Sequence, residues 1–179
     1  MKIDHYVSAL QLRGLISLVP CGLLAIGGVV LHAQAQDASG GGTYFVMPGV
    51  RSQFQFNVDH VQCKVGHTVL PDGTAFQMFM FSTSVDSVTI DSAAKSVTIT
   101  GSMVSIVDLR SPIGTTVRMS ETVPYTAYAK EGGTPGAQAD FFSVIVLYDA
   151  HAPGPNQFDL FGSPATFAGD LLTGSVTVK

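Results

Sequence analysis

The stretch HVQCKVGH, residues 60–67, brings two histidines and one cysteine within eight positions. Imidazole nitrogens and a thiolate are zinc ligands, and with a methionine such as Met78 they would also suit blue copper. The candidate metal ligands are therefore His60, Cys63 and His67. In blue-copper proteins, however, the cysteine lies near the C-terminus, whereas more than a hundred residues follow Cys63 here.

The alternation of apolar residues around this stretch favours a strand and turn over a metal site. Apolar side chains occupy even positions before residue 59 and odd positions after residue 60, namely Phe54, Phe56 and Val58, then Val61, Cys63 and Val65. This shift of phase predicts a β-bulge or bend at Asp59–His60. Cys63 would then face the core and His67 would lie in a turn, so we expect no metal or other cofactor.

A second group of possible ligands follows an apolar run, in YDAHAPGPNQFD, where Asp149, His151 and Asp159 surround a loop. Calcium sites need several oxygen ligands converging from one loop, as in D-x-D-x-D-G, and the sequence has no such motif. We expect Asp149 to end a strand and to accept backbone hydrogen bonds in the turn.

The remaining residues do not form a recognisable catalytic group. The sequence lacks G-x-S-x-G, and Glu121 and Glu131 are its only glutamates, so neither a nucleophile nor a carboxylate pair is indicated. We therefore predict that the protein is not an enzyme. Sugar binding would need exposed aromatic rings, and without tryptophan only Tyr44 and Tyr128 are candidates for such a platform.

The N-terminal segment predicts export. Lys2 and Arg13 precede an uncharged apolar run, residues 14–31, and the small residues Ala33 and Ala35 follow at the spacing that signal peptidase requires. We expect a signal peptide over 1–35 with cleavage after Ala35, which gives a secreted, periplasmic or cell-surface protein. An uncleaved membrane anchor is the alternative, but the proline and glycines within the run disfavour it.

Composition restricts the partners further. The net charge is −4 and no basic run occurs, so nucleic acid is not an expected partner. No membrane association is expected after cleavage. Cys21 leaves with the signal peptide, so Cys63 has no intramolecular disulfide partner. One domain of this length can enclose a single core, and we expect a flexible N-terminus over 36–42 and a β-sandwich domain over 43–179.

Short runs rich in Val, Ile, Thr, Phe and Tyr, separated by turn residues, predict an all-β fold. Residues 87–91 and 96–101 flank SAAK as a hairpin. Residues 117–130 place six side chains on one face, with Pro124 marking an edge or a break: Val117, Met119, Val123, Tyr125, Ala127 and Ala129. Residues 140–149 are apolar on both faces and should form a central strand. We expect an antiparallel β-sandwich of about nine or ten strands, with a jelly-roll or a partly open barrel as alternatives.

The order of these motifs resembles the post-COAP domain family of bacterial extracytoplasmic β-rich domains. The resemblance rests on a GGG start, an F-x-F-N strand, a P-x-G-x-x-F turn, an aromatic–Asp pair and a closing G-S-V strand, at residues 40–42, 54–57, 71–76, 148–149 and 174–176. It implies export and a β-rich fold, and no catalytic residues come with it. We expect an exported, non-catalytic structural or interaction module whose partner is an extracytoplasmic protein or polysaccharide, the alternative being a carbohydrate- or matrix-binding module.

Overall fold

The computed structural model describes residues 37–70, 72–133, 139–148 and 164–179. They belong to one compact unit, Gln34–Lys179, and the expected signal peptide, 1–35, lies outside them. The described residues form eight strands and no helix. The strands are β1 (Ala38–Met47), β2 (Val50–Asn57), β3 (His60–Val69), β4 (Ala75–Asp91), β5 (Ser96–Arg110), β6 (Thr116–Lys130), β7 (Phe141–Val146) and β8 (Ala165–Val178).

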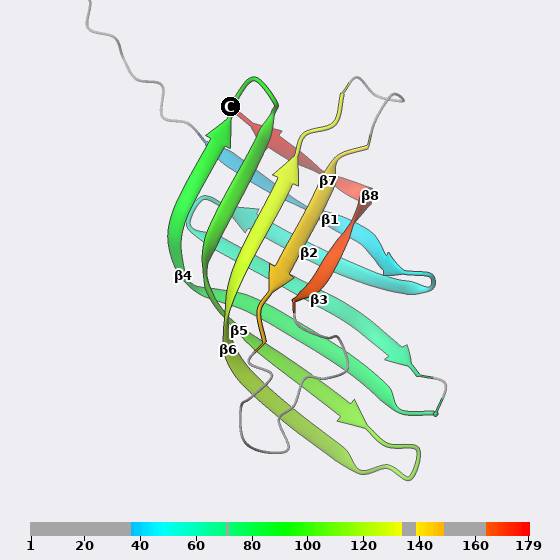
Figure 1. The fold of residues 1–179 in the computed structure, drawn as a ribbon. Helices are drawn as coiled ribbons and strands as arrows, with labels where there is room; N and C mark the ends of the chain where they lie inside the picture. Colours follow the sequence, from blue (N-terminus) through cyan, green and yellow to red (C-terminus); the bar gives the residue numbers. More distant parts are fainter. Residues whose placement is uncertain (1–36, 71, 134–138, 149–163) are drawn as a thin grey trace, which may run out of the picture. The chain divides into compact units, whose positions relative to one another are not determined.

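The strands form a closed antiparallel barrel in which each strand pairs with its neighbour in sequence and β8 returns to β1 (Figure 1). The expectation of an all-β, antiparallel fold is confirmed. The expectation of a sandwich of nine or ten strands is wrong, because the described residues contain eight strands that close into one sheet.

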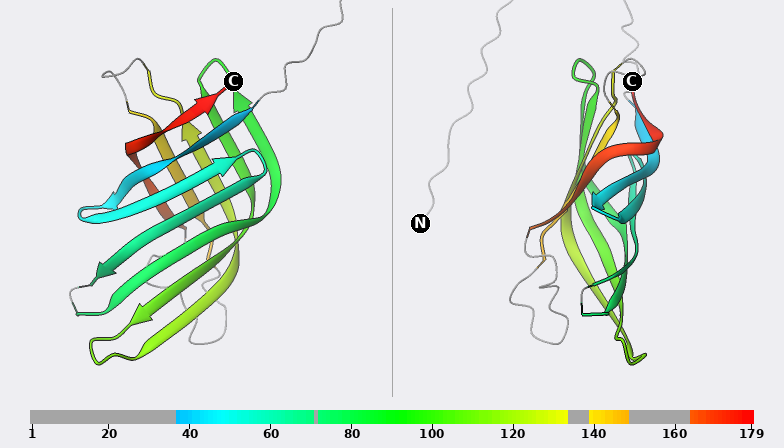
Figure 2. Two further views of the ribbon diagram at one scale, coloured as in Figure 1. Left: turned by 180° about the vertical axis from the view of Figure 1, so that it is seen from behind. Right: turned by 90° about the vertical axis from the view of Figure 1, so that its right-hand side faces the viewer.

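The number of strands is lower than expected because three of them, β4, β5 and β6, are long. The second half of β4, the first half of β5 and the second half of β6 lie beside β7 in one layer of a flattened barrel, and their other halves continue the β1–β2–β3 layer (Figure 2). The strands turn between the layers where β4 has register shifts at 82–87, β5 has Gly101 and β6 has Pro124. Bulges and small residues bend a strand without ending it, so the described residues form two layers from few separate strands.

Pro124 lies within a continuous strand, not at a break. β6 pairs with β5 from Thr116 to Lys130, but with β7 only from Tyr125 onward. The Pro124 carbonyl accepts a hydrogen bond from the Leu147 amide, at 3.1 Å, where the second ladder begins. Of the six residues expected on the inner face, Val117 is 47% exposed, and the other five are buried.

Within the expected flexible segment, 36–42, residues 38–42 form part of the barrel wall instead, since β1 begins at Ala38 and pairs with both β2 and β8. The glycines of this segment let neighbouring residues lie close to the β1 backbone. A side chain at Gly40 would meet the Phe56 ring, and one at Gly42 would overlap the Thr173 carbonyl. The GGG run therefore allows neighbouring strands and an aromatic ring to pack directly against the β1 backbone.

The shift of phase near residue 59, where a β-bulge or bend was expected, is a chain reversal between two strands and not a bulge within one strand. Asn57 pairs with His60, so residues 58 and 59 form a two-residue hairpin turn, and the Asn57 side chain accepts a hydrogen bond from the Asp59 amide at 2.9 Å. Directly opposed residues in antiparallel strands point to the same face. Because Phe54 lies opposite Cys63, the residues that face the core have even numbers before the turn and odd numbers after it.

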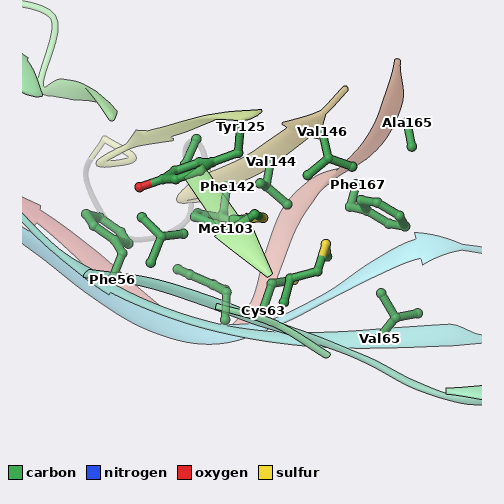
Figure 3. Packing of buried hydrophobic residues seen from close by; sticks show 14 of the residues in the cluster. Phe56, Cys63, Val65, Met103, Tyr125, Phe142, Val144, Val146, Ala165 and Phe167 are labelled. Atoms are coloured by element: carbon green, nitrogen blue, oxygen red, sulfur yellow. The ribbon is translucent and has the colours of Figure 1, made fainter. Parts of the chain in front are cut away.

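The barrel interior is filled by side chains from both layers (Figure 3). Phe142 of β7 is fully buried and stacks on Phe54 of β2 with ring centroids 4.1 Å apart, and Tyr44 meets both rings edge-on. β7 pairs with β6 and β8 along its whole length, which confirms a central strand within the expected run 140–149, over Phe141–Val146. The hairpin between β4 and β5 around SAAK is also confirmed.

Candidate functional site

The structure does not bring the three candidate ligands of HVQCKVGH together. Cys63 faces the core. His60 is half-buried on the other face of β3, where its Nδ1 lies 3.1 Å from the Ser82 hydroxyl. His67 is exposed at a register shift between Val65 and Thr68. Within the described part of the chain, no three His, Cys, Asp or Glu side chains are grouped closely enough to hold a metal ion.

Cys63 belongs to a small buried polar cluster. Its Sγ lies 3.2 Å from the Ser52 hydroxyl and 3.5 Å from the Tyr44 hydroxyl. Ser52 also donates a hydrogen bond to the Lys64 carbonyl at 3.1 Å. Burial raises the pKa of the Cys63 thiol above its usual value. Because the thiolate is the metal ligand and the nucleophile, this environment makes Cys63 a core residue with low reactivity.

We predict that Cys63 does not react with a thiol reagent in the folded protein. The thiol is 1% exposed and its raised pKa leaves little thiolate at neutral pH. Labelling with Ellman's reagent should be negligible for hours in buffer and complete within minutes in guanidinium chloride. Rapid labelling of a protein whose melting curve is unchanged would contradict the placement of Cys63 in the core.

The second candidate group, Asp149, His151 and Asp159, lies outside the described residues, so its expected lack of a metal stays a prediction. The chain leading to it is anchored in the barrel through Tyr148. This side chain is buried, with its hydroxyl 3.0 Å from the Ser105 hydroxyl and 3.9 Å from the Met78 sulfur.

We predict that the barrel loses stability above pH 10 through Tyr148. Burial raises the pKa of Tyr148 from 10 to about 12, while its hydrogen bond with Ser105 opposes the shift. The unfolded chain releases this proton near pH 10, whereas the folded chain keeps it until about pH 12. Stability should therefore fall across this interval, by about 3 kcal/mol for this group.

Urea unfolding at a series of pH values from 8 to about 12 would measure this loss. Tyr148→Phe should reduce the slope of stability against pH, although Tyr44, whose pKa burial also raises, will retain part of it. Tyr128→Phe, on the outer face, is the matched control. Equal slopes in the Tyr148→Phe and control proteins would contradict the prediction.

Tyr44 and Tyr128 were expected to form an exposed aromatic platform, and this prediction is wrong for Tyr44. Its side chain is 0% exposed and lies inside the barrel, while its neighbour Phe45 is 44% exposed. Tyr128 is half-buried on the outer face of β6, with its ring centroid 6.1 Å from that of Phe141.

A different pair of rings lies on the outer face of the β1–β2–β3 layer. Phe79 and Phe81 of β4 are partly exposed and oppose Ile106 and Val104 of β5. The Lys64 ammonium lies 5.0 Å from the centroid of the Phe79 ring. The neighbouring strands add exposed amide side chains at Gln53, Gln55 and Gln62. We call these four apolar residues and three glutamines the Phe79–Phe81 platform.

Basic side chains gather beside the platform, toward the β3–β4 turn. Arg51 of β2, His67 of β3 and Arg110 of β5 are exposed, and Lys64 is half-buried. Arg118 of β6 is also exposed and binds the Asp108 carboxylate through two hydrogen bonds of 2.6 and 2.8 Å. This contact lowers the pKa of the Asp108 carboxyl below its usual value.

In comparisons with known proteins, no family model, no curated protein and no solved structure matches the chain. In the described residues, no helix has the length and apolar character needed to cross a membrane.

Sequence reasoning missed this surface because its members lie on five strands. Arg51, Lys64 and Arg118 are isolated cations in the sequence, and only the register of β2 to β6 places them on one face. The sequence offered one signal for this surface, the alternation within each strand. Lys64 and Phe79 lie at positions that alternate with buried residues, which indicates the outer face for both.

Proposed function

We propose that the protein is an exported, non-catalytic interaction module that binds its partner with the outer face of the barrel. The observation that supports this proposal is the division between the two faces. The inner face is packed with buried side chains, whereas exposed rings, amides and cations occupy the outer face of the β1–β2–β3 layer. A rigid scaffold with adhesive groups on its surface suits recognition.

A carbohydrate- or matrix-binding role is the second candidate, and the Phe79–Phe81 platform favours it. Aromatic rings stack on the apolar faces of sugars, and neighbouring amides pair with hydroxyl groups. This platform replaces the expected pair of Tyr44 and Tyr128, because Tyr44 is buried. Phe79, Phe81 and the three glutamines supply both kinds of group on adjacent strands.

The test is sedimentation of the purified protein with washed envelopes of its host cells. We expect saturable binding that falls at least tenfold in a Phe79→Ser/Phe81→Ser protein. Val88→Ser/Leu172→Ser removes two other exposed apolar side chains, 36% and 47% exposed, and should leave binding unchanged. Equal losses in both proteins, or ester, peptide or glycoside hydrolysis by the wild type, would contradict a specific non-catalytic role.

Export through residues 1–35 and membership of the post-COAP-like group remain part of this proposal. Export rests on the signal-peptide pattern of residues 1–35. Membership of the group rests on the motifs that run from residues 40–42 to residues 174–176. Intact mass measurement of the exported protein tests the first directly. The expected product begins at Gln36, and a product that retains the apolar run 14–31 would indicate an anchor instead.

A further inference from the structure

Two neighbouring depressions lie on the outer face of strands β2 to β6. One is lined by Arg51, Gln53, Lys64, Gly66, His67 and Gln77. The other is lined chiefly by His67, Gln77, Asp108, Arg110, Thr116 and Arg118. Because the two share His67 and Gln77, they form one shallow trough that crosses the strands. Five strands at about 4.8 Å spacing give it a length of about 19 Å.

The trough is positively charged in a protein that is otherwise acidic. Four Lys and Arg residues lie along it, together with His67, although the whole sequence has only nine Lys and Arg against thirteen Asp and Glu. Asp108 is the one acidic residue that lines either depression. Its carboxylate is already bound by Arg118, so the charges of Arg51, Lys64 and Arg110 are not neutralised by the lining.

The lining selects among anionic partners. The amides of Gln53 and Gln77 lie between the cations and offer hydrogen bonds to hydroxyl groups. A nucleic acid duplex or an anionic membrane presents negative charge over a wide area, which the net negative charge of the rest of the chain would repel. A single linear chain across the strands contacts only the trough.

We propose that this trough binds a linear anionic polysaccharide, with Arg51 and Lys64 at one end and Arg110 at the other pairing with its acidic groups. Arginine matches carboxylate and sulfate groups with paired hydrogen bonds, and lysine adds a point charge. This inference rests on the proposed interaction role, and it names the ligand class and the part of the outer face that binds it.

Titration calorimetry with polygalacturonate tests the proposal, with pullulan as the neutral polysaccharide. We expect binding of polygalacturonate alone, and weaker binding when the ionic strength rises from about 0.05 to about 0.5 M, because added salt screens the exposed charges. Arg51→Gln/Lys64→Gln should weaken binding at least tenfold. Lys130→Gln/Lys179→Gln removes the same charge outside the trough and should bind within twofold of the wild type.

A second variant at the other end of the trough, Arg110→Gln, should also weaken binding while its melting curve stays that of the wild type. Equal effects of the two double variants, or no binding of polygalacturonate, would overturn the proposal. Tighter binding of phosphatidylglycerol vesicles or of a single-stranded oligonucleotide would overturn the ligand class. Envelope binding that depends on Phe79 and Phe81 but not on the trough would keep the proposed function and reject this inference.

Discussion

Val144→Asp is expected to prevent the barrel from folding. Val144 is 0% exposed on β7, between Ala127 of β6 and Phe167 of β8. An aspartate there would bury a carboxylate among apolar side chains without a hydrogen-bonding partner, at a cost of several kcal/mol even if it becomes protonated. Because a domain of this size has a total stability of about 5–15 kcal/mol, we expect little or no soluble exported protein.

Ile145→Asp is the matched control for this change. Ile145 is the next residue of β7, but it is half-buried on the opposite face, opposite Thr126 and Thr166. The control protein should accumulate in soluble form with a lower melting temperature. A Val144→Asp protein that is soluble and melts within a few degrees of the wild type would show that this strand does not face the core.

Gly101→Ala is expected to destabilise the barrel by about 2–4 kcal/mol. Gly101 lies where β5 crosses from one layer to the other, and a methyl group there would overlap the backbone carbonyl of Ser84. It would also lie 3.1 Å from the Tyr125 ring. Backbone atoms cannot move aside as a flexible side chain can, so β4 and β5 would have to separate at the bend.

Gly41→Ala separates this effect from the general cost of changing a glycine in a strand. A methyl group at Gly41 would have its nearest neighbour, the Phe54 carbonyl, at 3.4 Å, which is an ordinary contact. Urea unfolding of the two variants should therefore give a change within about 1 kcal/mol for Gly41→Ala. Equal destabilisation by the two substitutions would contradict a bend that requires glycine at position 101.

Alternation of apolar residues predicted the local structure well wherever one strand face is buried. It identified the inner faces of β2, β3 and the second half of β6, and it identified β7 as a strand with neighbours on both sides. These features depend only on which side chains avoid water. The phase change at residue 59 was also visible, but a bulge and a two-residue reversal give the same pattern over so short a stretch.

The errors arise where a residue type has two physical uses. The GGG run is typical of a flexible segment, but at 40–42 it admits a ring and a neighbouring strand. Tyr44 and Phe45 are adjacent aromatics, and only the register of β1 decides that Tyr44 is buried. Strand number was overestimated because Gly101 and Pro124, which usually end a strand, here lie at bends within long strands.

The candidate binding surface could not be predicted because only the register of strand pairing brings its residues together. Gln77 of β4 opposes Asp108 of β5, and Asp108 opposes Arg118 of β6. These pairings place Gln77 and Arg118, which are 41 positions apart in the sequence, in one row. Without the pairing pattern, the same residues are scattered polar positions on separate strands.

Closure of the barrel between β1 and β8 is the central claim, and a cross-link tests it most directly. The Thr43 and Thr173 hydroxyl oxygens lie 2.8 Å apart across this pair of strands. Thr43→Cys/Thr173→Cys should therefore form a disulfide under mild oxidation, detected by intact mass, while a Thr43→Cys/Thr100→Cys control should not. No cross-link in a folded Thr43→Cys/Thr173→Cys protein, or equal cross-linking in the control, would contradict a closed barrel.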